Sequence, residues 1–178
     1  MEHIKQWQIA GAIFTIIVGT LLHFVYEWSG RNELVAYIAP INESIWEHQK
    51  LLFTPVVLFS IIELFVYGKY IPNFIPVKVL SILIGILVII ASYYTYSGIL
   101  GHNCLISDIG TFILGVLASY LFSNHFLNTD FFTAPGWRFA SFVLFALLIF
   151  CFGTFTLNPP HIAMFEDSVT HTYGKVTT

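Results

Sequence analysis

The sequence contains few charged residues for its length. Only 10% of its 178 residues are Asp, Glu, Lys or Arg, whereas 57% are hydrophobic and the mean hydropathy is +0.79. A soluble domain carries roughly 25% charged residues, so this composition could not cover a surface with groups that water solvates. We therefore expect an integral membrane protein, with membrane lipid as the partner of most of its surface.

Basic residues and cysteines are also scarce. Lys and Arg together number seven and the formal net charge is −3, so the chain lacks the basic face that nucleic acid requires. Its two cysteines, Cys104 and Cys151, are expected at different depths, one in a loop and one within an apolar run. Neither a disulfide nor a thiolate metal site is therefore predicted.

Long apolar segments make up most of the chain. A bilayer core of about 30 Å requires about 20 helical residues. Five segments satisfy this length, namely residues 7–28, 44–67, 76–96, 109–126 and 136–156. The predicted fold is all-α, a polytopic membrane bundle of about five transmembrane helices in a single domain, 1–178. Residues 157–178 form an extramembrane C-terminal tail, and Phe165 and Tyr173 suggest that it folds back over the polar site.

An odd number of spans distributes the loops between two faces of the membrane. The N-terminal face receives four basic and three acidic residues: Lys5, Lys69, Lys78, Arg138, Glu2, Glu63 and Asp130. The opposite face receives three basic and seven acidic residues: Arg31, Lys50, Lys175, Glu27, Glu33, Glu43, Glu47, Asp108, Glu166 and Asp167. The positive-inside rule then predicts a cell-membrane protein with a cytoplasmic N-terminus and an extracytoplasmic C-terminus.

Histidines accompany the acidic residues on that second face. Five of the seven histidines are assigned to it: His23, His48, His102, His161 and His171. Imidazoles and carboxylates near hydrocarbon are costly unless they pair with each other or bind a cation. Their accumulation indicates a polar site at the acidic face.

His23 and Glu27 lie four residues apart, so they project from one side of the first predicted helix. One interpretation is an interhelical hydrogen bond beside an interfacial acid. The other is a metal ligand with its partner, because a carboxylate can orient the second nitrogen of a ligating imidazole.

The segment PINESIWEHQK holds the densest group of candidate ligands. Ser44 and Glu47 match a capping box, which satisfies the free N–H groups at a helix start. The capping box explains Glu47. The helix dipole favours an acid near a helix start, which partly explains Glu43. It does not explain His48, whose potential positive charge is disfavoured there. We expect these side chains to face inward within one turn, with Asn42 in support.

Two further segments on this face add candidates. In GHNCLISD, Asp108 or Ser107 can cap the fourth helix. His102 and Asn103 are either a solvated loop pair or part of the site. The Asn-Pro-Pro sequence after the fifth helix presents His161, which either marks an ordinary helix stop or supports the site.

Glu63 lies near the other end of the second predicted helix and is expected to extend toward Lys69 at the interface. Otherwise the helix halves nearer the N-terminal face carry mainly scattered serine and threonine. This asymmetry favours a one-sided pocket over a pathway across the membrane.

The chain resembles an uncharacterised family of small bacterial multi-pass membrane proteins, seen mostly in Gram-positive anaerobes. Four stretches carry the resemblance: LLHFVYEWSG, PINESIWEHQKLLF, YSGILGHNCLISDIGTF and TLNPPHIAMFEDSVTHTYG. It implies a membrane location and a bacterial source but no activity, since the family is a domain of unknown function. The arrangement is more distantly similar to intramembrane zinc hydrolases of the ceramidase and receptor type, but it has fewer helices and lacks their paired histidines in the last helix.

The leading hypothesis is a metal-dependent membrane enzyme that acts on a lipid or lipid-linked substrate at the outer leaflet. A divalent ion, zinc or manganese, would be held by His23, Glu43, Glu47, His48 and His102. An open position on the ion would activate water, with Glu27 or Asp108 as general base. The supporting residues are Asn42, Asn103 and His161.

Two other classes remain open. Intramembrane histidine and glutamate beneath an acidic mouth also describe a cation or proton transporter or channel subunit. Histidines can equally serve a membrane binding protein that senses pH or metal. Transport predicts polar residues that continue to the other face, or a homo-oligomer that forms the pore.

Overall fold

The computed structural model describes residues 2–175, which form an all-α bundle. The long helices are α1 (Glu2–Trp28), α4 (Lys50–Val66), α5 (Phe74–Leu100), α6 (Leu105–Phe126) and α7 (Pro135–Leu157). Short helical turns in the connections are α2 (Glu33–Ala36), α3 (Ile45–His48), η1 (Gly68–Tyr70) and η2 (Ala163–Phe165). With α3 and α4 taken together, five helical segments are long and apolar enough to cross a membrane. The predicted bundle of five apolar helices is confirmed.

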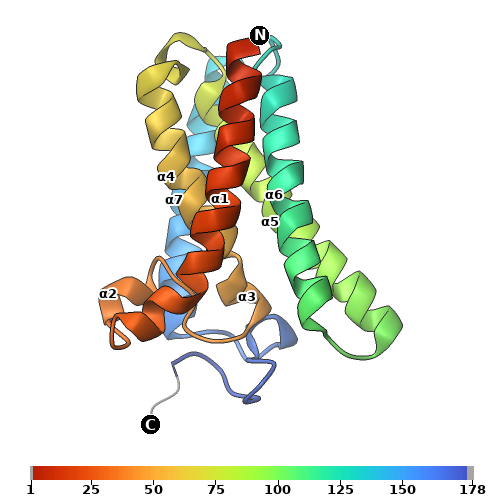
Figure 1. The fold of residues 1–178 in the computed structure, drawn as a ribbon. Coiled ribbons are helices and arrows are strands. Elements are labelled where there is room, and N and C mark those ends of the chain that lie inside the picture. The colour runs from red at the N-terminus through yellow and green to blue at the C-terminus, as the bar shows by residue number, and fades with distance from the viewer. Residues whose placement is uncertain (1, 176–178) are drawn as a thin grey trace.

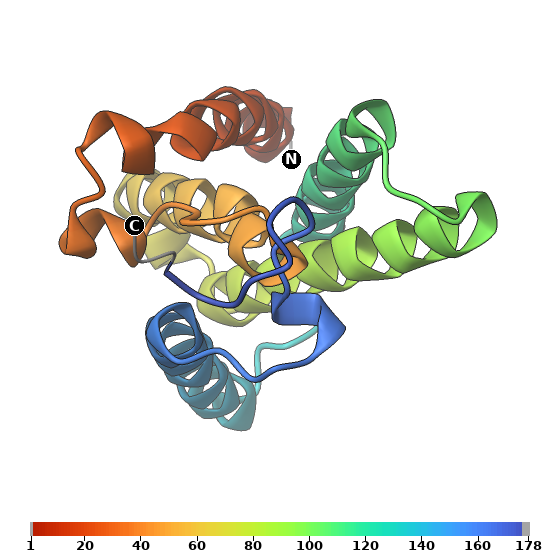
Figure 2. The same cartoon turned by 90° about the horizontal axis from the view of Figure 1, so that it is seen from below.

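The long helices run side by side, with the N-terminus at one end and the C-terminal segment at the other (Figure 1). The second end, which carries α2, α3 and residues 158–175, is called the loop end below. There, α5 and α6 lean outward, so their connection lies away from α1 and α3 (Figures 1 and 2).

The second predicted span consists of α3 and α4, which follow each other directly. Gln49 separates α3 from α4, and its side-chain amide donates a hydrogen bond of 3.0 Å to the carbonyl of Ile45. Pro55 lies inside α4 and has no N–H for the carbonyl of Leu51, which is therefore left without its helical donor.

A close approach of α1 to α4 occurs at this carbonyl. A Cβ atom on Gly19 would lie 2.4 Å from the Leu51 oxygen, so any larger residue would separate the two helices. His23 is one turn after Gly19 on α1, and His48 precedes Leu51 by three residues. The helix contact therefore brings these two imidazoles opposite each other.

A buried ionic network occupies the bundle near the N-terminus. The Glu63 carboxylate lies 2.5 Å from Lys78 Nζ and accepts hydrogen bonds from Gln8 (2.6 Å) and from the hydroxyl of Tyr67 (2.5 Å). Glu63 and Lys78 are only 0% and 4% exposed. The prediction that Glu63 extends toward Lys69 is therefore wrong, because α5 supplies a cation that is buried with it.

Candidate metal centre

Three side chains from different elements meet at the loop end. His23 lies near the end of α1, Glu43 lies in the loop between α2 and α3, and His48 ends α3. One potential ligand atom from each lies within 4.8 Å of the other two. The structure thus brings together three of the five predicted metal ligands.

The separations in this His23–Glu43–His48 group suit one small cation. His23 Nε2 lies 3.6 Å from one carboxylate oxygen of Glu43, and His48 Nε2 lies 3.4 Å from the other. The imidazole ring centroids are 5.3 Å apart. Two ligands bound at about 2.0–2.2 Å to a tetrahedral ion lie roughly 3.3–3.6 Å apart. The two contacts between imidazole and carboxylate are therefore already close to this separation, and the three ligand atoms all lie within 4.8 Å of one another.

A backbone contact fixes which nitrogen of His48 can bind a cation. His48 Nδ1 lies 2.8 Å from the carbonyl oxygen of Ser44. A carbonyl only accepts hydrogen bonds, so Nδ1 carries a proton and Nε2 is the nitrogen that faces Glu43. At this separation of 3.4 Å, Nε2 either carries a proton and donates to the carboxylate, or it offers a lone pair to a metal ion that the carboxylate also binds.

Glu43 is held in its charged form. The contact with the His48 imidazole lowers the pKa of Glu43 most, and the nearby His23 lowers it further, whereas burial and Asp167 act in the opposite direction. The net pKa lies below the ordinary glutamate value. The carboxylate is therefore available as a cation ligand at neutral pH.

A small pocket opens beside the group. Its volume is about 60 Å³, and His23 and Glu43 lie on its wall together with Tyr26, Glu27 and Asn42. Since about 10–15 Å³ of such volume is enough to hold one water molecule, the pocket can admit water or a small polar group next to His23 and Glu43.

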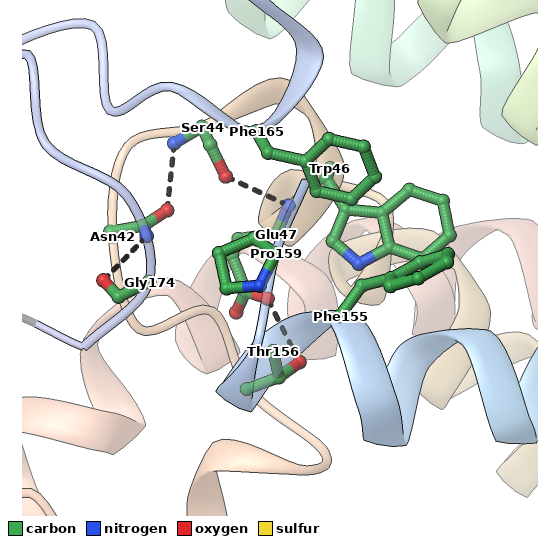
Figure 3. Close-up of a pocket in the computed structure, with 9 residues that line it drawn as sticks. All are labelled: Asn42, Ser44, Trp46, Glu47, Phe155, Thr156, Pro159, Phe165 and Gly174. Carbon is green, nitrogen blue, oxygen red and sulfur yellow. Dashed lines mark hydrogen bonds between the residues drawn. The ribbon is translucent and has the colours of Figure 1, made fainter. Parts of the chain in front are cut away.

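Glu47 belongs to a separate cluster instead of facing His48. Its carboxylate accepts hydrogen bonds from the backbone N–H of Ile41 (3.0 Å), from Lys50 Nζ (2.6 Å) and from the hydroxyl of Thr156 (2.9 Å). Figure 3 shows the last of these contacts. With its oxygens already occupied, Glu47 ties the ligand-bearing loop to α4 and α7.

The capping box around Glu47 is only half formed. Ser44 Oγ accepts a hydrogen bond from the N–H of Glu47 at 3.3 Å, but the N–H of Ser44 donates to Asn42 instead, at 3.0 Å. The carboxylate turns to Lys50, which is 0% exposed and also donates to the carbonyl of Ala36. Sequence reasoning missed Lys50, although its spacing of three residues from Glu47 is typical of a helical ion pair.

The structure does not bring His102 into the group. It is exposed in the connection between α5 and α6, and its Nδ1 lies 3.0 Å from the carbonyl of Asn103. The outward lean of both helices carries this connection away from α1 and α3 (Figure 2). Asp108, near the start of α6, accepts a hydrogen bond from the hydroxyl of Tyr96.

The remaining candidates lie around the edge of the site. Glu27 lines the pocket and pairs with Arg31 at 3.1 Å. The side-chain amide of Asn42 donates to the carbonyl of Gly174 at 3.0 Å. His161 stacks on Tyr173 with ring centroids 4.5 Å apart, so it supports the fold of the C-terminal segment rather than the ligand group.

Comparison with known proteins places the chain in one family. A family model described as a family of unknown function (DUF6512) matches residues 1–175. Neither the curated proteins nor the solved structures contain a match. The expected resemblance to an uncharacterised family is confirmed, and the chain belongs to DUF6512, a family of unknown function.

Proposed function

We propose that this protein is a metal-dependent membrane enzyme whose His23, Glu43 and His48 hold a divalent cation, zinc or manganese. The observation that carries the proposal is the meeting of two imidazoles at one carboxylate: His48 Nε2 lies 3.4 Å from one Glu43 oxygen and His23 Nε2 lies 3.6 Å from the other. Two imidazoles and one carboxylate leave one position of a tetrahedral ion open for water, as in catalytic zinc sites.

Glu27 is the proposed general base. It lines the same pocket as His23 and Glu43, where water bound to the ion would lie. Its ion pair with Arg31 is largely exposed, and such pairs contribute at most about 1 kcal/mol, so the carboxylate can release Arg31 and accept a proton. A bound divalent ion lowers the pKa of water to about 7, which makes this transfer feasible at neutral pH.

A lipid or lipid-linked molecule is the proposed substrate. The group lies at the end of apolar helices, and Phe24 and Trp28 of α1 remain 47% and 69% exposed near His23. Exposed aromatic residues at the end of a membrane span are typical of the interface where lipid head groups lie. The charge distribution favours the outer leaflet, and a compartment reporter fused to the C-terminus should therefore respond as extracytoplasmic.

The enzymatic proposal is tested by the Glu27→Gln variant. Protein loaded with zinc and reconstituted into vesicles of zwitterionic and anionic phospholipids should release a lipid fragment, measured by mass spectrometry. Loss of a general base should lower the rate by about 10²–10⁴-fold while zinc binding stays unchanged.

Glu33→Gln is the matched control for this variant. Glu33 is another exposed acid at the loop end, paired with Lys175 rather than with the ligand group, so its replacement should leave turnover intact. Zinc binding without turnover of any vesicle lipid would contradict an enzyme and would favour a metal sensor.

Proton or cation transport is a second candidate, and one observation favours it. The Glu63–Lys78 pair extends buried charge toward the N-terminal end, and a hydrogen bond of 2.9 Å between Thr15 and Tyr120 lies deeper in the bundle. Transport predicts a cation or proton flux across vesicles that Glu63→Gln abolishes. The enzymatic proposal predicts no such flux.

A further inference from the structure

Glu43 differs from the other two proposed ligands because no helix holds it. His23 belongs to α1 and His48 to α3, whereas Glu43 lies in the loop between α2 and α3. A ligand on a loop must be fixed by neighbouring groups if the site is to keep its geometry.

The C-terminal segment supplies these neighbours. Asp167 Oδ2 accepts a hydrogen bond from the backbone N–H of Glu43 at 3.3 Å, and the hydroxyl of Ser168 donates to the Glu43 carbonyl at 3.2 Å. Both backbone polar groups of Glu43 therefore contact residues more than 120 positions later in the chain. The amide of Asn42 makes a parallel contact to Gly174, and Figure 2 shows the segment crossing the loop end.

The segment that holds Glu43 is itself well fixed. Asp167 is 4% exposed, and its other oxygen accepts hydrogen bonds from the N–H groups of Val169 (2.8 Å) and Thr170 (2.9 Å). Three backbone N–H groups therefore fix the orientation of the Asp167 carboxylate, with one of its oxygens directed at Glu43.

Aromatic packing anchors the same segment to the helices. Phe165 is 5% exposed and lies against Trp46 and Phe155, with ring centroids 5.0 Å and 5.4 Å away (Figure 3). Trp46 belongs to α3 and Phe155 to α7, so the segment is clamped to both elements beside the ligand loop.

We infer that Asp167 and Ser168 are positioning residues that hold the Glu43 carboxylate between the two imidazoles. The inference rests on the proposed metal site. Neither residue contacts the ion; each acts on the backbone of a residue that does. Loss of such an outer contact typically lowers metal affinity by about 10–100-fold.

The Asp167→Asn variant tests this role with Co²⁺ as the probe. Asparagine retains one oxygen for Val169 and Thr170, but its amide nitrogen would oppose the N–H of Glu43, so mainly the contact with Glu43 is lost. Titration of the full chain in detergent should show an affinity for Co²⁺ reduced by about 10–100-fold. The visible spectrum at saturation should shift toward that of Glu43→Gln, because a Glu43 carboxylate that is no longer held in place would bind the ion less completely.

Glu166→Gln is the matched control. Glu166 lies in the same segment, but its carboxylate contacts His171 at 2.8 Å rather than Glu43, so the Co²⁺ affinity and spectrum should match the wild type. A merely structural role of Asp167 would lower the melting temperature of the apoprotein without altering the spectrum. Ser168→Ala, which removes only the contact to the Glu43 carbonyl, should weaken binding severalfold and replaces Asp167→Asn if that variant does not fold.

The outcomes separate the two proposals. If the wild type binds Co²⁺ and Asp167→Asn binds it with the same affinity and spectrum, the positioning role is overturned and the metal site stands. If the wild type binds no Co²⁺, the metal site fails and the positioning role fails with it.

Discussion

Replacing His48 with alanine should abolish the stabilisation of this protein by divalent metal ions. A bound ion raises the free energy of unfolding by about 2.7 kcal/mol when the free ion is 100 times its dissociation constant. His48 Nε2 lies 3.4 Å from the Glu43 carboxylate, so the variant lacks one of the three proposed ligands. Thermal unfolding in detergent should show an upward shift with zinc or manganese for the wild type, reversed by a chelator, and no shift for His48→Ala.

His125→Ala provides the control for this experiment. His125 lies in the last turn of α6, at the end of the bundle that carries the N-terminus (Figure 1). The metal-induced shift should persist in this variant. A shift of equal size in His48→Ala and in the wild type would contradict the assignment of His48 as a ligand.

The same shift should depend on pH with a defined sign. A metal ligand must be deprotonated, so protons compete with the ion at both imidazoles. The stabilisation should be fully present above the ordinary imidazole range near 6.5 and should decrease as the pH falls through it. The lowered pKa of Glu43 means that its carboxylate remains charged across this interval.

The Glu63→Gln variant should lose about 3–5 kcal/mol of stability, because Lys78 would be left as a buried charge without its partner. Lys78 is 4% exposed, and its Nζ lies 2.5 Å from the Glu63 carboxylate. Combining Glu63→Gln with Lys78→Met should recover much of the loss, since the double variant contains no unpaired charge. Unfolding of both variants in detergent measures the difference.

Lys69→Met is the control for Lys78→Met, because it also removes one positive charge but at a site outside the ion pair. Lys69 contacts the ring of Tyr70, with its Nζ 5.0 Å from the ring centroid, and it belongs to no part of the buried network. Its replacement should change stability by less than about 0.5 kcal/mol. If the single and double variants at Glu63 and Lys78 were equally unstable, the account of a mutually neutralised pair would fail.

Hydropathy was sufficient to predict the five long helices, because each exceeds the length that a bilayer requires. It could not predict the local irregularity at Gln49, which depends on hydrogen bonding within the turn. Nor could it predict the partner of Glu63. Lys69 is nearer in sequence, but the packing of α5 against α4 places Lys78 beside the carboxylate.

Helix periodicity predicted part of the ligand group. It correctly predicted that His48 and Glu43 lie at one depth. It also predicted that Glu43 and Glu47, four residues apart, share one side of a helix. That rule holds only within a helix, and Glu43 lies before the cap residue Ser44. Glu47 does not join the ligand group because its carboxylate is buried in a hydrogen bond with Lys50. His102 lies away from the group because the outward lean of α5 and α6 carries their connection away from α1 and α3 (Figure 2). Hydropathy does not encode this lean, so it could not be predicted.

Metal content of the purified protein tests the central claim most directly. The three proposed ligands lie close enough together for a single site, so elemental analysis of wild-type protein prepared without chelator should find about one equivalent of zinc or manganese per chain. The double variant Glu43→Gln, His48→Ala should contain essentially none after the same preparation. A wild-type protein that is isolated without metal, and that takes up neither ion when it is supplied in excess, would contradict the metal-dependent account.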